Sequence, residues 1–118
     1  IRVAGNSGPL QQELTWPEMH ELTGGYVNTP ELTTVTRKPR RIGRWDADLV
    51  KRALIHNGAP SNSTHLVVTF LDYVDPELAD QEGELTAKAA AWLQAVEQDV
   101  KQRVDAYTTG ADSITWRA

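Results

Sequence analysis

Apolar and polar positions alternate along the chain in a way that predicts strands separated by helices. The run HLVVTFL, residues 65–71, is apolar and β-branched, typical of a strand buried on both faces. Residues 104–107 predict a second strand. Between them, apolar side chains at helical spacing predict a helix over about 86–103, and these are Ala89, Leu93, Val96, Val100 and Val104. Strand, helix and strand in this order form a crossover that joins parallel strands, so we predict the α/β class with a partial parallel sheet.

Two further helices are predicted before this crossover. Thr15-Trp16-Pro17-Glu18 matches a capping box with proline in the first turn, and it predicts a helix to about Leu22 that Gly24 and Gly25 end. Asp46 is expected to cap a second helix, ADLVKRALIH, which Asn57-Gly58 stops. Asp75-Pro76-Glu77 predicts one more helix start.

The opening of the chain predicts a strand and a turn. Ile1-Arg2-Val3 is apolar or β-prone and runs into the turn-forming residues 5–9. We expect this strand to have no partner within the chain, and we interpret the chain as a fragment of a larger protein. A fragment should expose an apolar edge or face, and the four tryptophans are consistent with that expectation.

Two polar turns are expected to meet at one edge of the predicted sheet. Asp72 follows the first strand, and Thr108-Thr109-Gly110 follow the second. Parallel strands bring their carboxyl ends to the same edge, where open α/β sheets bind ligands. A single aspartate after a strand is more often a cap or turn residue. Two polar turns together favour a binding crevice.

Basic residues concentrate in the segment TTVTRKPRRIGRWD, residues 33–46. Five of the chain's twelve basic residues lie there, although the net charge is −4, and they are Arg37, Lys38, Arg40, Arg41 and Arg44. We predict a polar loop that binds a small anion. A solvated run of charge is the alternative, and a small nucleic-acid-binding module is a weaker one, because few aromatic residues accompany the loop.

Composition narrows the class of protein. The 118 residues suit one compact domain, and no apolar run approaches the roughly 20 residues that a membrane span needs. The acidic balance argues against a nucleic-acid-binding protein, since duplex binding uses a broad basic face. There is no cysteine, which fits the cytoplasm. The three histidines lack metal-ligand spacing, so no metal site is predicted in this chain.

Several segments together resemble the C-terminal third of adenylosuccinate synthetases. They are residues 2–14, the basic segment with its Gly43-Arg44-Trp45-Asp46, the run TFLDYVD of residues 69–75, and Thr108-Thr109-Gly110. The resemblance implies a fragment of a larger P-loop-type α/β ligase, with residues 1–118 as its single C-terminal domain. That family joins L-aspartate to inosine monophosphate, using GTP and Mg²⁺ to form a 6-phosphoryl intermediate that the aspartate amine displaces.

The resemblance assigns the basic loop to aspartate and phosphate binding. The family motif Thr-Thr-Gly-Arg-Pro-Arg-Arg falls on residues 35–41, so the implied contacts are Val35, Thr36, Arg37, Lys38, Arg40 and Arg41. Lys38 replaces the first arginine of the motif and loses its bidentate fork. Arg37 replaces the glycine, which leaves the register open by one residue. Guanidinium groups suit both dicarboxylates and phosphates.

The resemblance also implies a site for the purine base. The family's Lys-Leu-Asp and Ser-Thr-Gly fall on Phe70, Leu71 and Asp72 and on Thr108, Thr109 and Gly110. Asp72 could accept hydrogen bonds from two donors of guanine. Because Phe70 replaces the lysine, the chain looks closer to the divergent phage and archaeal branch. That branch includes phage enzymes that attach aspartate to dGMP and can use ATP. The choice between IMP and dGMP as the aspartate acceptor stays open, and so does the choice between GTP and ATP as the phosphoryl donor.

The family's phosphate loop, general-base aspartate and acid histidine lie outside this chain. No catalytic residue is therefore assigned here, the ligands of Mg²⁺ are expected elsewhere, and the fragment alone is expected to be inactive. The resemblance implies a homodimer when the protein is intact, with a purine nucleoside monophosphate, L-aspartate and a nucleoside triphosphate as partners. The alternative function is a non-catalytic anion-binding or interaction domain that retains the fold.

Overall fold

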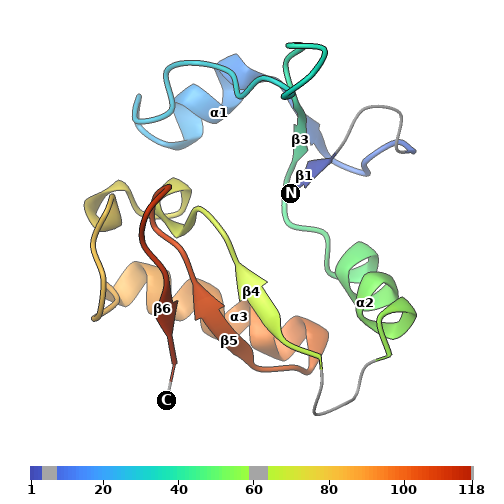
Figure 1. Cartoon of the computed structure of the whole chain (residues 1–118), viewed down its shortest axis with the longest axis vertical. Coiled ribbons are helices and arrows are strands. Elements are labelled where there is room, and N and C mark those ends of the chain that lie inside the picture. The colour runs from blue at the N-terminus through green and yellow to red at the C-terminus, as the bar shows by residue number, and fades with distance from the viewer. Residues whose placement is uncertain (4–7, 59–63, 118) are drawn as a thin grey trace. The chain divides into compact units, whose positions relative to one another are not determined.

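The computed structural model describes residues 1–3, 8–58 and 64–117 of the chain, which forms two compact units (Figure 1). Unit 1 comprises Ile1–Asp46 and unit 2 comprises Ala47–Ala118. Most of the turn predicted over residues 5–9 lies outside the described residues.

Helix α1 (Trp16–Leu22) of unit 1 begins and ends as its sequence predicts. Thr15 Oγ1 accepts a hydrogen bond from the Glu18 backbone N–H at 3.2 Å, and Glu18 Oε1 accepts from the Thr15 N–H at 3.3 Å. These two bonds satisfy backbone donors that a helix start leaves unpaired. Gly24 and Gly25 have φ of +64° and +88°, the left-handed conformation that ends the helix.

Unit 1 also contains a three-stranded antiparallel sheet in the order β1-β3-β2, formed by β1 (Arg2–Val3), β2 (Glu13–Leu14) and β3 (Arg41–Gly43). The prediction that the first strand lacks a partner is wrong, because Arg2 pairs with Ile42 and Val3 with Arg41. The prediction of a loop throughout the basic segment is also wrong at its end. Ile42 is 1% exposed, and its burial draws residues 41–43 into the central strand.

Unit 2 has the predicted α/β crossover. Its sheet has the order β4-β5-β6, with β4 (Leu66–Val68) parallel to β5 (Val104–Tyr107) and β5 antiparallel to β6 (Thr115–Trp116). The α/β class is confirmed. The prediction of a strand buried on both faces is wrong for β4, because it is an edge strand and Val67 is 38% exposed.

Helix α3 (Ala87–Val100) supplies the core of unit 2 and lies behind the sheet in Figure 1. All five residues of the predicted apolar stripe are buried. The helix stops three residues before the predicted end, because Lys101 takes the left-handed conformation with φ of +54°. Helix α2 (Ala47–His56) has the predicted bounds, and Leu54 is its buried residue.

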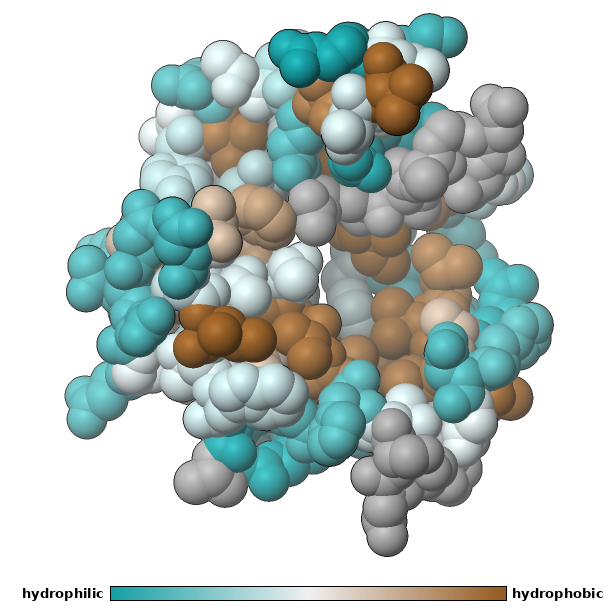
Figure 2. Space-filling model, in the orientation of Figure 1, coloured by the Kyte–Doolittle hydropathy of each residue, from teal (hydrophilic) through white to brown (hydrophobic). Residues whose placement is uncertain are grey.

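The sheet of unit 2 exposes apolar side chains, and an exposed apolar edge or face was expected for a fragment. Figure 2 shows apolar residues on the side of unit 2 that faces the viewer, away from α3. The most exposed apolar side chains of the sheet and its adjoining loop are Val67 at 38%, Ile114 at 48% and Trp116 at 61%. The structure therefore leaves one face of this sheet without a covering helix within the described part of unit 2.

Two short 3₁₀ turns connect β4 to α3. The first, η1, is Leu71–Tyr73, and the second, η2, is Pro76–Leu78. Asp75 caps η2, since its Oδ1 accepts from the Glu77 N–H at 3.1 Å. The helix predicted to start here is only this short turn. Asp75 Oδ2 also accepts from Thr86 Oγ1 at 2.6 Å, which ties the turn to the start of α3.

These hydrogen bonds make the stability of unit 2 sensitive to acid. The hydroxyl of Thr86, the Glu77 N–H and the charge of Lys88 lower the pKa of Asp75 below its ordinary 3.8. A lowered folded-state pKa stabilises the protein above about pH 3.8, and this contribution is lost as the pH falls through the lower folded value. We expect Thr86→Ala to raise the pKa of Asp75 and to reduce the difference in unfolding free energy between pH 6 and pH 3. Urea unfolding at both pH values measures it.

Thr86→Ser is the matched control, because it keeps the hydroxyl. Thr86 also caps α3 through the Ala89 N–H, at 3.3 Å, and that loss should be equal at both pH values. An equal loss of stability at pH 6 and pH 3 would show that Asp75 contributes nothing to the acid sensitivity.

Candidate functional site

The basic segment begins as a tight loop between two chain segments that run antiparallel. Leu32 pairs with Pro39 across its base, and the Arg40 N–H donates to Glu31 O at 2.7 Å. Within the loop the Thr33 N–H donates to Lys38 O at 2.8 Å. Thr33 Oγ1 accepts from the Lys38 N–H at 3.0 Å and lies 2.6 Å from Thr36 Oγ1. The threonines therefore shape the loop. Val35 lies at its tip and is 90% exposed.

Arg37 occupies the left-handed backbone conformation in this loop, with φ of +56°. Its N–H donates to Thr33 O at 3.0 Å, so the conformation closes the turn. A residue with a Cβ is strained there, whereas glycine is not. The motif that residues 35–41 resemble has glycine at this position. The backbone thus supports the register in which Arg37 replaces that glycine and Lys38 replaces the first arginine.

This strain predicts that glycine stabilises unit 1. We expect Arg37→Gly to raise the unfolding free energy by about 0.5–1 kcal/mol, since the relief of left-handed strain exceeds the entropy that glycine adds to the unfolded chain. Arg37→Ala removes the same charge but keeps the Cβ, so it should stay within about 0.5 kcal/mol of the original. Denaturant unfolding compares the two. Equal stabilities for Gly and Ala would contradict the prediction.

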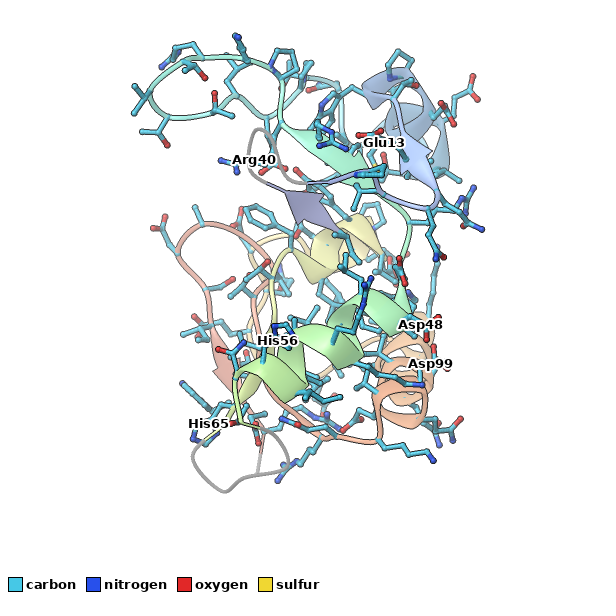
Figure 3. The ribbon with its side chains drawn as sticks, turned by 90° about the vertical axis from the view of Figure 1, so that its right-hand side faces the viewer. Glu13, Arg40, Asp48, His56, His65 and Asp99 are labelled. Atoms are coloured by element: carbon cyan, nitrogen blue, oxygen red, sulfur yellow. The ribbon has the colours of Figure 1, made fainter. Side chains whose placement is uncertain are left out.

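The structure divides the basic residues into two groups. Arg41 is held in the sheet, because its Nε donates to Glu13 Oε1 at 2.6 Å and its side chain reaches Gly8 O at 3.2 Å. No ion pair joins Lys38 or Arg40 to another residue in the described ranges. Arg40 extends outward from the ribbon in Figure 3, apart from Glu13. Arg41 therefore serves the sheet, whereas the charges of Lys38 and Arg40 are not engaged by an ion pair within these ranges.

Trp16 positions the backbone beside these two cations. Its indole N–H donates to Arg40 O at 2.9 Å, across 24 residues of sequence. Trp16 also lines a hollow of about 300 Å³ in unit 1 with Pro17, His20 and residues 27–30. The sequence predicted Trp16 only as part of a helix start. Nothing in its spacing indicates the bond to Arg40, because that bond depends on how α1 packs beside β3.

In unit 2 the two predicted polar turns meet at one edge of the sheet. The Leu71 N–H donates to Thr108 O at 2.8 Å, and the Phe70 N–H donates to Thr108 Oγ1 at 2.9 Å. The Thr108 N–H donates in turn to Val68 O at 2.9 Å. The parallel pairing of β4 and β5 brings these residues together, as the crossover predicts.

The polar side chains at this edge differ in how far they face solvent. Asp72 is 3% exposed and Thr109 is 1% exposed, whereas Leu71 belongs to the core. Thr109 Oγ1 donates to Gln81 O at 2.6 Å and lies 2.8 Å from Ser113 Oγ. Thr109 thus fastens Gln81 to the turn. Thr108, Gly110 and Phe70 are half-buried, so they are the predicted residues of this turn that reach its surface.

Two residues at this edge, Tyr73 and Asp80, were not predicted from the sequence as site residues. Tyr73 lies beside Phe70, with ring centroids 5.4 Å apart. The Asp80 N–H donates to Thr109 O at 3.0 Å, and the Asp80 side chain packs closely against Gly110. Tyr73 could have been noticed from its place three residues after Phe70. Asp80 gives no such signal, since its approach depends on the fold of residues 79–83.

Similarity to proteins of known name covers most of the chain. It is 33% identical over 108 residues, or 90% of its length, to the adenylosuccinate synthetase of Archaeoglobus fulgidus. It is 35% identical over 108 residues to the Methanococcus vannielii protein of that name and 31% over 107 residues to that of Methanosphaera stadtmanae, each covering 89% of the chain. Over about nine-tenths of its length, the chain is therefore similar to adenylosuccinate synthetases. No family model matches it.

The similarity has a limited span within these relatives. The chain spans 29% of the length of each of the three adenylosuccinate synthetases. The similarity to adenylosuccinate synthetases that the motifs predicted is confirmed, and its span is that of a fragment. All three relatives are archaeal proteins, which agrees with the archaeal half of the expected branch.

The described residues also bear on metal binding and on membrane insertion. No group of three or more His, Cys, Asp or Glu side chains gathers there in a way that could hold a metal ion. We accordingly assign no described residue to Mg²⁺. None of the helices in the described ranges has the length and apolar character to cross a membrane.

Proposed function

We propose that this chain forms the nucleotide- and aspartate-binding part of a cytoplasmic purine-biosynthetic ligase. The intact protein would join L-aspartate to a purine nucleoside monophosphate and hydrolyse a nucleoside triphosphate. The observation that carries the proposal is the similarity to adenylosuccinate synthetases over about nine-tenths of the chain. The backbone of Arg37 supports the proposal as well, because it takes the left-handed conformation at the position of the motif glycine.

In this proposal the loop of unit 1 binds the anionic groups. Lys38 and Arg40 would donate charge-assisted hydrogen bonds to the carboxylates of aspartate or to phosphates. Val35, Thr36 and Arg37 would shape the loop around them, and Arg41 would hold β3 through Glu13. Lysine at position 38 supplies a point charge, so Arg40 would supply the planar fork that fixes a carboxylate.

The turns of unit 2 would bind the purine base. Residues 70–72 and 108–110 meet at the carboxyl edge of β4 and β5, where open α/β sheets bind ligands. IMP and dGMP are the two acceptors that we propose to test, with GTP and ATP as donors. Phe70 and Lys38, which replace motif residues, favour the phage-like alternative of dGMP and ATP. Magnesium would be held by residues outside this chain, so we derive no step through it.

The test is an assay of the native protein that contains this chain. It would be incubated with L-aspartate, Mg²⁺ and each pair of IMP or dGMP with GTP or ATP, and the aspartate adduct would be followed by mass spectrometry. An adduct from either acceptor supports the proposal, and the productive pair identifies the branch. Binding of aspartate and nucleotide without any adduct would favour the alternative, a non-catalytic anion-binding domain. If the protein bound neither ligand and formed no adduct, both the ligase proposal and the alternative of an anion-binding domain would be overturned.

The chain by itself offers a second arm of this test. We expect residues 1–118 alone to form no adduct, because no catalytic residue of the reaction is assigned to them. Turnover by this chain alone would contradict that assignment. The homodimer implied by the resemblance can be examined in the same native preparation by sedimentation.

A further inference from the structure

Helix α2 ends at a dipeptide whose chemistry the proposed function does not use. Asn57-Gly58 follows the last helical residue, His56, which Figure 3 labels, and both residues of the dipeptide are exposed. Gly58 has φ of +88°, and apart from its chain neighbours no heavy atom of the described residues lies within 4 Å of where its Cβ would be. The peptide nitrogen that follows Asn57 is therefore unhindered by a side chain.

The same two residues carry the groups of a spontaneous reaction. The Gly58 nitrogen, once it has lost its proton, can attack the side-chain carbonyl carbon Cγ of Asn57. A C–N bond forms, ammonia leaves, and the chain then contains a cyclic imide. Water opens either carbonyl of the imide and leaves aspartate, or isoaspartate in which the chain continues through the side-chain carbonyl. Glycine favours the attack, because the absence of a Cβ allows a close approach of its backbone.

Hydrogen bonds in the last turn of α2 hold the two reacting groups apart. Asn57 Nδ2 donates to Ala53 O at 2.7 Å, which turns the side-chain amide back along the helix. The Gly58 N–H donates to Ile55 O at 3.0 Å, so the attacking nitrogen is bonded as well. Thr64 Oγ1 donates to Asn57 O at 3.2 Å and joins the turn to the chain before β4. Attack on Cγ therefore requires that this turn opens.

The end of α2 is a place where such opening is easy. Ile55 is 67% exposed, and Leu54 is the buried residue of the helix. Helix ends with few buried contacts and solvent-exposed backbone hydrogen bonds open at a small fraction of the global unfolding free energy. Asn57 and Thr64 also line an open hollow of about 420 Å³, so water can reach the amide.

We propose that Asn57-Gly58 is a site of spontaneous deamidation, and that the last turn of α2, held closed by Thr64, sets the rate of the reaction. The inference does not depend on the proposed function, because it involves no ligand. Deamidation removes the donor to Ala53 O and places a carboxylate at the helix C-terminus, where negative charge is unfavourable. The same turn carries Leu54, whose carbonyl accepts from the Asn57 N–H at 3.1 Å, so the modified protein is less stable.

The first test compares folded with unfolded protein. The native protein that contains this chain would be incubated at pH 8 with and without urea, and the amide of Asn57 would be followed by peptide mass spectrometry, with isoaspartate measured separately. We expect the unfolded protein to lose the amide about ten-fold faster or more, because the turn is open in every molecule. Asn57→Gln is the control, since its longer side chain does not place the carbonyl carbon for this ring closure, and it should keep its amide in both conditions.

Variants of the folded protein test the turn itself. Thr64→Val removes the hydroxyl that donates to Asn57 O, and it should speed the loss of the amide about two- to ten-fold, the effect of one hydrogen bond. Thr64→Ser keeps a hydroxyl and should stay near the original rate, with circular dichroism to show that both variants are folded. Asn57→Asp imitates the product and should lower the urea midpoint of unfolding.

The outcomes judge the site and the turn separately. Faster loss on unfolding and in Thr64→Val, with the new carboxylate or isoaspartate at position 57, supports the inference. Equal rates in folded and unfolded protein overturn control by the turn, and so does an original rate in folded Thr64→Val. An amide that survives in unfolded protein overturns the site itself. Each result holds whether or not the protein forms the aspartate adduct, so the ligase proposal is judged by its own assay.

Discussion

Replacement of Leu93 by alanine is expected to destabilise unit 2 by about 2–5 kcal/mol, the cost of emptying a leucine site in a packed core. Leu93 is 1% exposed and lies in the buried stripe of α3 with Ala89, Val96 and Val100. A small domain has only about 5–15 kcal/mol of stability, so this loss would be a large part of the total. Urea unfolding followed by circular dichroism measures it.

The control for Leu93→Ala is an exposed apolar residue of the same unit. Ile55 lies in α2 and is 67% exposed, so Ile55→Ala should change the unfolding free energy by no more than about 0.5 kcal/mol. Similar losses in the two variants would mean that the stripe of α3 is not the core of unit 2.

Loss of the Arg40 side chain is expected to weaken binding of L-aspartate about ten-fold or more. A charge-assisted hydrogen bond typically contributes about 1.5–3 kcal/mol, and Arg40 has no ion pair within the described residues that would compete for it. Lys38→Ala should have an effect of the same order. Titration calorimetry of the native protein that contains this chain, with L-aspartate and nucleotides as ligands, measures both.

Two further variants show whether geometry or charge matters at this loop. Arg40→Lys keeps the charge and loses the bidentate fork, so it should recover only part of the affinity. Arg44→Ala removes an exposed cation from the same segment beyond β3 and should leave affinity nearly unchanged. Equal effects of Arg40→Ala and Arg44→Ala would indicate a solvated run of charge without a specific site.

Local patterns in the sequence determined the helices and the crossover. The capping box at Thr15 and Glu18 forms as predicted, because both partners lie within four residues. The apolar stripe of α3 is buried for a similar reason, since helical periodicity places those side chains on one face. The order of strand, helix and strand predicted the parallel pairing of β4 and β5, and with it the meeting of Phe70 with Thr108. The motifs also predicted the relationship to adenylosuccinate synthetases.

Tertiary structure alone decided which predicted site residues face a ligand. Arg40 and Arg41 are adjacent and chemically identical, yet Glu13, 28 residues before Arg41, holds that residue in the sheet. Phe70 and Asp72 are only two residues apart, yet Phe70 is half-buried and Asp72 is buried. The left-handed conformation of Phe70 lies at the start of this turn. The partner of β1 was missed for the same reason. These outcomes depend on contacts between residues far apart in the chain, whose energies no local spacing of apolar and polar residues reports.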